Sequence, residues 1–445
     1  MLTTDDTTDE VRLVRLGRRP VRRRPWIVGG ALVVMLGAGA LWLTTRGNPV
    51  DDRILVVGQD GAISLLDPET GEAVLEVPDA TATPDRSALL TTDSNDGTTT
   101  LQSHDPVTGE VTGSTQLDGE LTVRTVSPQG GAVALMPGAK DAQLYEPEPR
   151  ERTSLTVSYL DDRVARTYDL DGNIEPEMFS FDEDGLFVLQ FEPPLEPTSY
   201  VVRRLDLATG EVTDTESDQV ELTSKMRGKA RAQVLHPDGT YLFTLYTLPN
   251  TGEPVYDVAA AGGAARYAFV HVINLKEEWS FCIFLPTPIG TVNEASVGMG
   301  ISPDGRELIV ADPSTSKVAR IDTESLVVRD TVTVDKLRDN AAKAAIAVAD
   351  GGAVFVATGP SLFELDPETL QASFAWGLST PGPITGLSLS ATGSQLRVAG
   401  DGAITLVDRA TRQETGVLYA PGRGTVTLLG SPRGSVTEFP LECAC

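Results

Sequence analysis

One turn signature recurs along the chain and limits the folds that it can adopt. It resembles Ser-Pro-Asp-Gly, as in Ser302–Gly305, and its copies follow one another roughly every 40 to 65 residues. A period of this length, with about four short strands per unit, is typical of a β-propeller blade. The eight copies are Thr83–Arg86, Ser127–Gly130, Asp182–Gly185, His236–Gly239, Ser302–Gly305, Ala349–Gly352, Ser390–Gly393 and Ser431–Gly434.

A second signature, Asp-x-x-Thr-Gly or a near relative, lies between alternating apolar segments. The Asp carboxylate accepts hydrogen bonds from backbone N–H groups two or three residues on, and Gly tolerates the positive φ that the turn needs. Each copy therefore predicts a hairpin between the third and fourth strands of a blade. The copies are Asp67–Gly71, Asp105–Gly109, Asp206–Gly210, Asp322–Leu326, Asp366–Leu370 and Asp408–Arg412.

The two ends of the repeating region complement each other. The segment Val56–Asp67 matches Val398–Asp408, so the first blade begins at its second strand. Its missing inner strand is predicted at Thr425–Leu429, which would close the ring and leave no open sheet edge. The sequence thus predicts an all-β, eight-bladed propeller over residues 53–440, or seven blades if the second sheet is incomplete.

These repeats resemble β-propellers of the YVTN and quinoprotein-like kind. The resemblance implies a fold and raises an alternative function, because eight-bladed quinoproteins hold pyrroloquinoline quinone on the ring axis. Those proteins carry Trp after the Thr-Gly turn, where this chain has Glu72, Glu110 and Glu211. Only Trp279 and Trp376 lie in the propeller at all. No cofactor is therefore predicted.

The N-terminus contains an uncharged run, Pro25–Thr45, that follows seven arginines. As a helix it would be about 31 Å long, enough to cross a bilayer, and the arginines predict that residues 1–24 stay in the cytoplasm. We therefore expect a single-pass membrane helix at 25–45, a linker at 46–52, and an extracytoplasmic propeller followed by a tail, 441–445, with two cysteines. The alternative is a cleaved signal peptide, which would export the same domain.

The exported part is strongly acidic. Residues 1–50 hold 8 arginines and 4 acids, so the rest carries 28 basic and 59 acidic groups, a net charge of 28 − 59 = −31. Such a field repels nucleic acid, which is excluded as a partner.

Residues with catalytic or metal-binding patterns are scarce. The three histidines lie far apart, there is no Gly-x-Ser-x-Gly, and Cys282 sits in an apolar run that predicts a buried thiol. The acidic stretch Asp169–Asn173 lacks the spacing of a calcium-binding EF-hand loop and is interpreted as a turn. We therefore predict no catalytic residue, no metal site, and a protein that is not an enzyme.

Long loops gather in three successive blades. They are the predicted loops between second and third strands, Lys140–Arg152, Glu192–Thr198 and Leu248–Arg266, all on one face of the ring. Binding sites often lie on such loops, and Tyr and Arg contribute most at protein interfaces. We expect a scaffold that binds an extracytoplasmic protein or envelope ligand through Tyr145, Arg150, Arg152 and Tyr256. The alternative is a propeller enzyme, a quinoprotein-like oxidoreductase or a metal-dependent lyase or lactonase, with an axial site.

Overall fold

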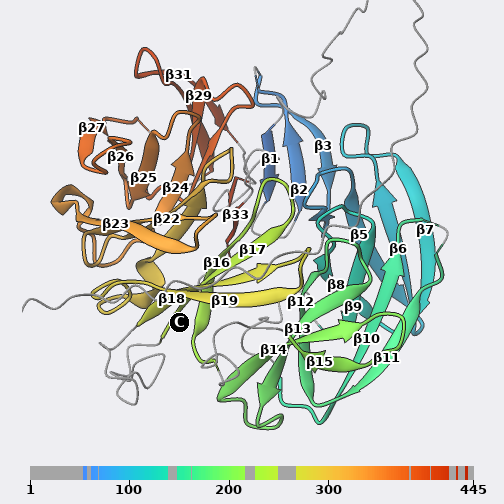
Figure 1. Ribbon diagram of the computed structural model, residues 1–445. Helices are drawn as coiled ribbons and strands as arrows, with labels where there is room; N and C mark the ends of the chain where they lie inside the picture. The colour runs from blue at the N-terminus through green and yellow to red at the C-terminus, as the bar shows by residue number, and fades with distance from the viewer. Residues whose placement is uncertain are drawn as a thin grey trace, which may run out of the picture. The chain divides into compact units, whose positions relative to one another are not determined.

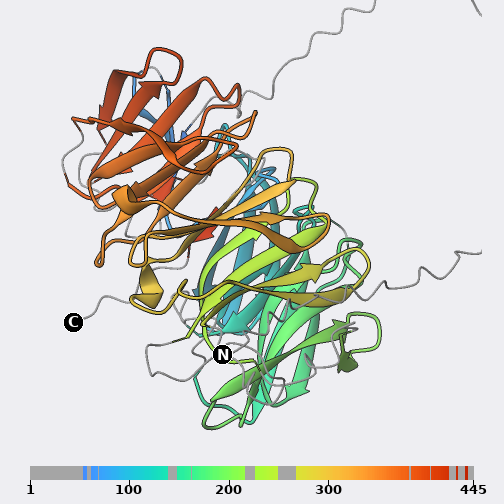
Figure 2. The same cartoon turned by 60° about the vertical axis from the view of Figure 1, so that its left-hand side comes forward.

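The chain folds into eight antiparallel sheets arranged as the blades of a propeller (Figures 1 and 2). The computed structural model describes residues 54–57, 62–68, 70–138, 148–161, 163–215, 226–248, 267–379, 382–400, 402–419, 427–428 and 436–438. Seven sheets have four strands and one has five. The predicted eight-bladed fold is confirmed, and the second blade is a complete sheet.

The strands of blades one to four are short, and all except β32 follow one another along the chain. Blade one holds β32 (Thr427–Leu428), β1 (Ile54–Val57), β2 (Ile63–Leu66) and β3 (Ala73–Val77). Blade two holds β4 (Thr81–Ala82), β5 (Leu89–Asn95), β6 (Thr98–His104) and β7 (Val111–Asp118). Blade three holds β8 (Leu121–Val126), β9 (Ala132–Pro137), β10 (Arg152–Tyr159) and β11 (Arg166–Asp171). Blade four holds β12 (Asn173–Phe179), β13 (Gly185–Glu192), β14 (Ser199–Asp206) and β15 (Val212–Asp214).

Blades five to eight repeat this order, with one strand added to blade five. Blade five holds β16 (Lys229–Leu235), β17 (Tyr241–Thr247), β18 (Ala268–Asn274), β19 (Trp279–Phe284) and β33 (Val436–Glu438). Blade six holds β20 (Gly298–Ile301), β21 (Glu307–Asp312), β22 (Lys317–Asp322) and β23 (Val327–Thr333). Blade seven holds β24 (Ala345–Val348), β25 (Val354–Thr358), β26 (Ser361–Leu365) and β27 (Ala372–Trp376). Blade eight holds β28 (Gly386–Leu389), β29 (Gln395–Gly400), β30 (Ala403–Asp408) and β31 (Gln413–Tyr419), and two 3-10 helices, η2 (Glu294–Ser296) and η3 (Asp335–Leu337), lie in linkers.

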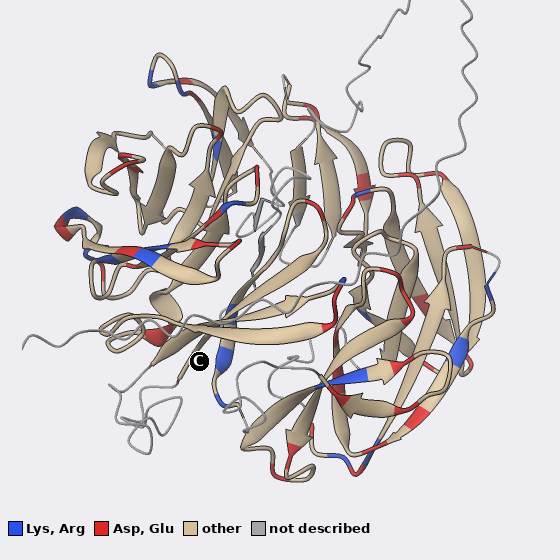
Figure 3. Cartoon of the chain, in the orientation of Figure 1, with Lys and Arg blue, Asp and Glu red and all other residues tan. Residues whose placement is uncertain are grey.

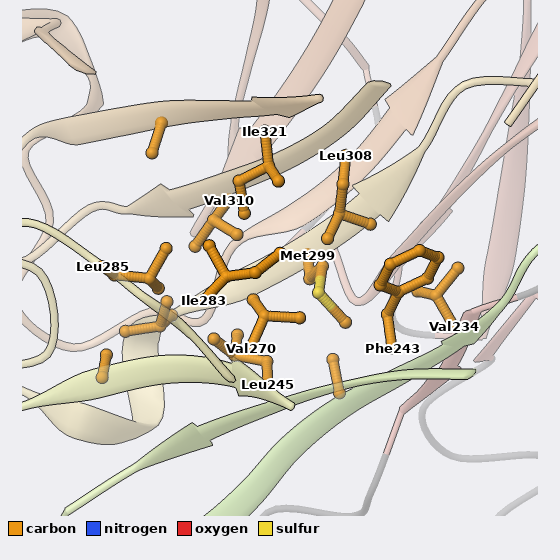
Figure 4. Close-up of a cluster of buried hydrophobic side chains, with 14 of the residues drawn as sticks. Val234, Phe243, Leu245, Val270, Ile283, Leu285, Met299, Leu308, Val310 and Ile321 are labelled. Atoms are coloured by element: carbon orange, nitrogen blue, oxygen red, sulfur yellow. The ribbon is translucent and has the colours of Figure 1, made fainter. Parts of the chain in front are cut away.

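Buried apolar side chains fill the space between neighbouring blades. Eight hydrophobic clusters are present, and each joins residues of two adjacent sheets. In the cluster between blades five and six, Phe243 and Val270 pack near Met299 and Val310 (Figure 4). Because blade eight also packs on blade one, through Ile404 and Ile54 among others, the packing runs around a complete ring.

The strands of each blade are designated A to D from the inside outward. The A strands of neighbouring blades are in contact and line the central channel, while D strands such as β7 and β27 lie at the rim (Figure 1). The A–B and C–D turns lie on one face, and the B–C loops and the linkers between blades lie on the other, here called the B–C face.

The ring closes by the predicted pairing of its two ends. Strand β32 pairs antiparallel with β1, with Val56 opposite Leu428 and Val57 opposite Thr427. The late strand therefore completes the first sheet and covers an edge that would otherwise be exposed.

The C–D turns have the chemistry that the sequence indicates. Asp206 Oδ1 accepts hydrogen bonds from the backbone N–H of Ala208 and of Thr209, at 3.0 and 2.7 Å. These bonds hold the pKa of Asp206 below its ordinary value. Glycine takes positive φ in three copies, but Leu326, Leu370 and Arg412 adopt the same conformation in the others. Glycine is thus favoured in this turn and not required.

One A–B turn lies two residues before its predicted position. In blade four the turn is Ser180–Glu183 rather than Asp182–Gly185, because Glu183 N–H donates to Ser180 O and Gly185 N–H donates to Ser180 Oγ. Ser127 has the same role in blade three, where its Oγ accepts from Ala132 N–H. In these two blades the Ser hydroxyl supports the turn, and in blade four the glycine of the predicted motif lies outside it.

The predicted membrane helix and N-terminal tail lie outside the described residues, as do Cys443 and Cys445. Within the part of the chain that is described, no helix has the length and hydropathy needed to span a bilayer.

The buried pair of Cys282 and His271 lies in the core of blade five. The two residues are opposite each other on β19 and β18, and each is at most 3% exposed. The prediction of a buried Cys282 is confirmed, and burial raises the pKa of its thiol. His271 Nδ1 receives no hydrogen bond from any described residue, in contrast to His104, whose two ring nitrogens contact Thr91 Oγ1 and Gly109 O.

This histidine should make the stability of the protein sensitive to mild acid. Burial lowers the pKa of His271 from 6.5 to about 4. Above pH 6.5 both folded and unfolded chains hold it neutral, but at lower pH the unfolded chain takes up the proton first. We expect a loss of about 3 kcal/mol as the pH falls to about 4. Urea unfolding of the wild type and of His271→Gln checks this, because an equal loss in both proteins would contradict the assignment.

Candidate functional site

The predicted binding residues are only partly described. Tyr145 and Tyr256 lie outside the described residues, so their predicted role is untested. Arg150 ends the B–C loop of blade three, and Arg152 begins β10. The Arg152 side chain is 58% exposed and pairs with Asp169 at 2.9 Å and Asp171 at 3.2 Å. It therefore remains accessible on the B–C face, whereas Arg150 is directed into the protein.

Three successive A strands contain a β-bulge, and each bulge carries a charged residue. The pairing of A with B shifts between Val123 and Thr125 in blade three, between Pro176 and Met178 in blade four, and between Ala230 and Ala232 in blade five. The residues that the strand register skips are Arg124, Glu177 and Arg231. No other described A–B pairing shows such a shift. Bulges redirect side chains and are common beside functional sites.

The bulges occur in the same three blades that have the long B–C loops. Together with nearby charged residues they form a polar cluster at the B–C end of the channel, which we call the mouth cluster. Its members are Arg124, Arg150, Glu175, Glu177, Arg231 and Lys343. Acidic residues are spread over the whole propeller, as expected for a chain of net charge −27 (Figure 3). The mouth cluster brings four cations together with the acids Glu175 and Glu177, and Glu294 lies 3.9 Å from Arg231.

The strongest contact of the mouth cluster joins Arg150 to Glu175. Arg150 Nη2 lies 2.5 Å from Glu175 Oε1 and 2.8 Å from Ile174 O. The Glu175 side chain is only 4% exposed, so this carboxylate is held inside the protein by a loop arginine. Burial raises the pKa of Glu175, and the charges of Arg150 and Arg124 oppose that rise.

Arg124 is less completely paired. Its Nη2 donates to Pro137 O at 3.4 Å, and its Nε is buried without a partner among the described residues. Burial lowers its pKa, and Glu175 opposes this effect. Arg124 is thus held near Glu175 by charge rather than by a direct hydrogen bond.

In the neighbouring blade five, Arg231 contacts the linker to blade six. Its Nε donates to Thr247 Oγ1 at 2.7 Å, its Nη2 lies 3.9 Å from Glu294 Oε1, and its carbonyl accepts from Lys343 Nζ at 3.0 Å. Lys343 comes from the linker between blades six and seven. The contact places the Lys343 ammonium group, a second cation, near the start of β16.

The third bulge residue, Glu177, is fixed by the neighbouring blade. Its Oε1 accepts from Gln233 Nε2 at 3.1 Å and from Thr244 Oγ1 at 3.2 Å. Gln233 and Thr244 belong to blade five. The bond therefore ties the inner strands of blades four and five below the mouth.

Asn173 fastens two of the predicted loops to each other. This fully buried side chain donates from Nδ2 to Glu148 O and to Pro194 O, both at 3.0 Å. Arg150 N–H also donates to Pro194 O at 3.2 Å. The described parts of the B–C loops of blades three and four thus form one supported surface.

The described part of the site offers charged groups and hydrogen bonds. Among the residues that the structure describes, no group of three or more His, Cys, Asp or Glu is placed to hold a metal ion. Asp169 and Asp171, considered in the sequence as calcium ligands, pair instead with Arg152.

Comparison with known proteins gives the fold. No family model and no curated protein matches the chain. Among solved structures, AztD from Citrobacter koseri is 10% identical, with a TM-score of 0.53 over 88% of this chain and 99% of that one. Dihydro-heme d1 dehydrogenase NirN, in complex with DHE, is 15% identical, with a TM-score of 0.52 over 88% of this chain and 75% of that one. The chain is a β-propeller.

At such low identity these likenesses show the architecture alone. They support the YVTN-like arrangement of blades that the repeats indicate. A fold matched by 1185 solved chains, one of them the enzyme NirN, does not decide between binding and catalysis.

Proposed function

We propose that this protein is a membrane-anchored, extracytoplasmic propeller that binds a protein or envelope ligand through the B–C face of blades three to five. The observation that carries the proposal is the coincidence of long loops, three charged bulges and most of the mouth cluster in these same blades. Strands position these charges, and the same blades carry the longest B–C loops, as expected for a binding site on a stable scaffold.

The alternative of an axial enzyme site has less support. Strand β33 pairs with the inner edge of β16 and so occupies part of the channel in which an axial cofactor would lie. A binding role needs no such space, because the partner contacts the face. Metal analysis and an absorption spectrum of the purified full-length protein check this, since a stoichiometric metal or quinone would favour the enzyme.

Site-specific cross-linking tests the proposed face. A photo-reactive residue in place of Arg152 on the B–C face is expected to give a discrete adduct in membranes of the native host. The same residue in place of Arg306, 83% exposed beside the opposite A–B turn, serves as the matched control. We expect an adduct yield at least about tenfold higher from position 152, because an interface excludes competing water.

A loop replacement tests the same face independently. Residues 140–147, which include Tyr145, are exchanged for a Gly-Ser link while Arg150 is kept, because Arg150 supports the buried Glu175. The adduct from position 152 should then disappear while the melting temperature stays the same. Equal adducts from both faces, or an adduct that survives the replacement, would refute the proposed binding face.

A further inference from the structure

The inner edge of β16 already carries an added strand. In an isolated blade this edge of the A strand faces the channel with no partner. Here β33 pairs antiparallel with it, placing Val436 opposite Val234, Thr437 opposite Gln233 and Glu438 opposite Ala232. Among the described sheets this is the only one with five strands. The backbone of β16 is thus shown to accept an extended segment inside the channel.

The path of the chain explains how β33 reaches this position. Strand β32 fills the A position of blade one, whose B strand is supplied by β1. The chain that follows β32 therefore has no place in blade one. Blade five lies opposite blade one in a ring of eight, so β33 pairs across the channel from β32. The tail crosses the channel because its ordinary site is taken.

The direction of β33 brings its C-terminal end to the mouth cluster. Strand β16 starts on the B–C face, and the antiparallel β33 therefore leaves toward that face. Its last paired residue, Glu438, lies opposite Ala232, next to Arg231. Arg231 in turn accepts Lys343 Nζ at its carbonyl. A strand bound here ends beside two cations, which favour an acidic residue at that end.

The internal strand is short enough to be replaced. Its pairing covers three residues of a seven-residue strand. A backbone hydrogen bond contributes only about 1 kcal/mol net, so the three-residue pairing of β33 gives limited stabilisation. The covalent link of β33 to the rest of the chain adds the advantage of a high effective concentration. Addition of a strand to a sheet edge is also a common mode of peptide recognition, with main-chain bonds giving affinity.

We propose that the inner edge of β16 is a strand-addition site, which takes an extended partner peptide with an acidic residue toward its C-terminal end in place of β33. This inference rests on the proposed binding function and names the kind of ligand. The segment Val436–Glu438 then acts as an internal occupant that keeps the edge covered until a partner displaces it.

Peptide binding to two variants tests the site. One variant ends at residue 434 and so lacks β33. The other keeps its length but carries Thr437→Pro, which removes a backbone donor from the ladder. The probe is a fluorescein-labelled peptide with the sequence of residues 434–440, Gly-Ser-Val-Thr-Glu-Phe-Pro. Control peptides carry Pro at the Thr position, or Lys in place of Glu.

We expect both variants to bind the probe at one to one, at least about tenfold more tightly than the wild type, whose own strand competes. The proline peptide should not bind, and the lysine peptide should bind several-fold more weakly. Hydrogen exchange of β16 should rise in both variants and return to the wild-type rate when the probe is added.

Other outcomes overturn the proposal. They are absence of probe binding to both variants, equal binding of the proline peptide, or exchange of β16 that is unaffected by the loss of β33. Such a result leaves the proposed function intact if the photo-reactive residue at position 152 still gives its adduct. Loss of that adduct together with retained peptide binding would instead reject the B–C face and keep the strand site.

Discussion

A chain that ends at residue 423 is expected to lose the closed ring. It lacks β32, so the edge of β1 is exposed, and Ile54 and Val56 lose part of their cover between blades eight and one. Full burial of each such side chain is worth about 1.5 to 3 kcal/mol, so partial exposure of both should cost about 3 kcal/mol and, in a domain of this size, lower the melting temperature by about 4 °C. Exposure of a strand edge should also promote aggregation.

The matched control is the chain that ends at residue 434, which keeps β32 and lacks only β33. We expect it to melt close to the wild type. Hydrogen exchange locates the effect, because loss of β32 should release the amides of β1, whereas loss of β33 should release those of β16. If the chain that ends at residue 423 melts like the wild type, the pairing of β1 with β32 does not hold the ring together.

The ring of blades could be predicted from the sequence because the turn residues that define each blade lie close together in the sequence. Six of the eight C–D turns contain their own Asp with a Thr or Ser, and each hydrogen bond within such a turn joins residues no more than four apart, as in Asp206–Gly210. The closing strand was predictable for a different reason. Val56–Asp67 repeats Val398–Asp408, and the comparison shows which strand of the first blade is missing.

Blade four shows the limit of such local signatures. Asp182–Gly185 has a final glycine and resembles the other turns, but the turn begins at Ser180, whose hydroxyl accepts Gly185 N–H. Glu183 takes the positive φ that glycine takes elsewhere. The hydrogen-bonding side chain, rather than the most conspicuous residue, sets the register.

The site was predicted only as a face. The long loops indicate the face on which we expect it, but Arg124 and Arg231 are charged residues in alternating strands and look like ordinary solvent-facing positions. Only the pairing of A with B reveals that they are bulges. Strand β33 was missed because its residues, Val-Thr-Glu, have no distinctive pattern, and its partner β16 is distant in sequence. The bulges and the pairing of β33 both depend on contacts between strands, which the repeated sequence motifs do not reveal.

Removal of the Arg150 side chain should have the second large effect. Arg150→Met leaves Glu175 buried without its ion-pair partner, and breaking such a pair costs about 3 to 5 kcal/mol. The double variant Arg150→Met, Glu175→Gln removes the buried charge and should recover about 2 kcal/mol or more of that loss. Arg152→Met is the matched control, because its ion pairs are exposed and contribute little.

The pH dependence of Arg150→Met identifies the cause of its instability. Burial already raises the pKa of Glu175, and without the arginine the pKa should rise further. The folded variant then takes up a proton more readily than the unfolded chain, so its deficit relative to the wild type should shrink as the pH falls through the folded pKa. A deficit that does not change with pH, or that persists in the double variant, would show that packing of the arginine matters rather than its charge.

The same double variant separates the two roles of Arg150. The sequence suggests a partner contact, and the structure shows an arginine that neutralises a buried acid. With the fold restored by Glu175→Gln, a loss of the position-152 adduct would show that Arg150 also contacts the partner. An unchanged adduct would show that Arg150 only supports the mouth cluster. Arg152, at the start of β10, would then be the arginine expected to contact the partner.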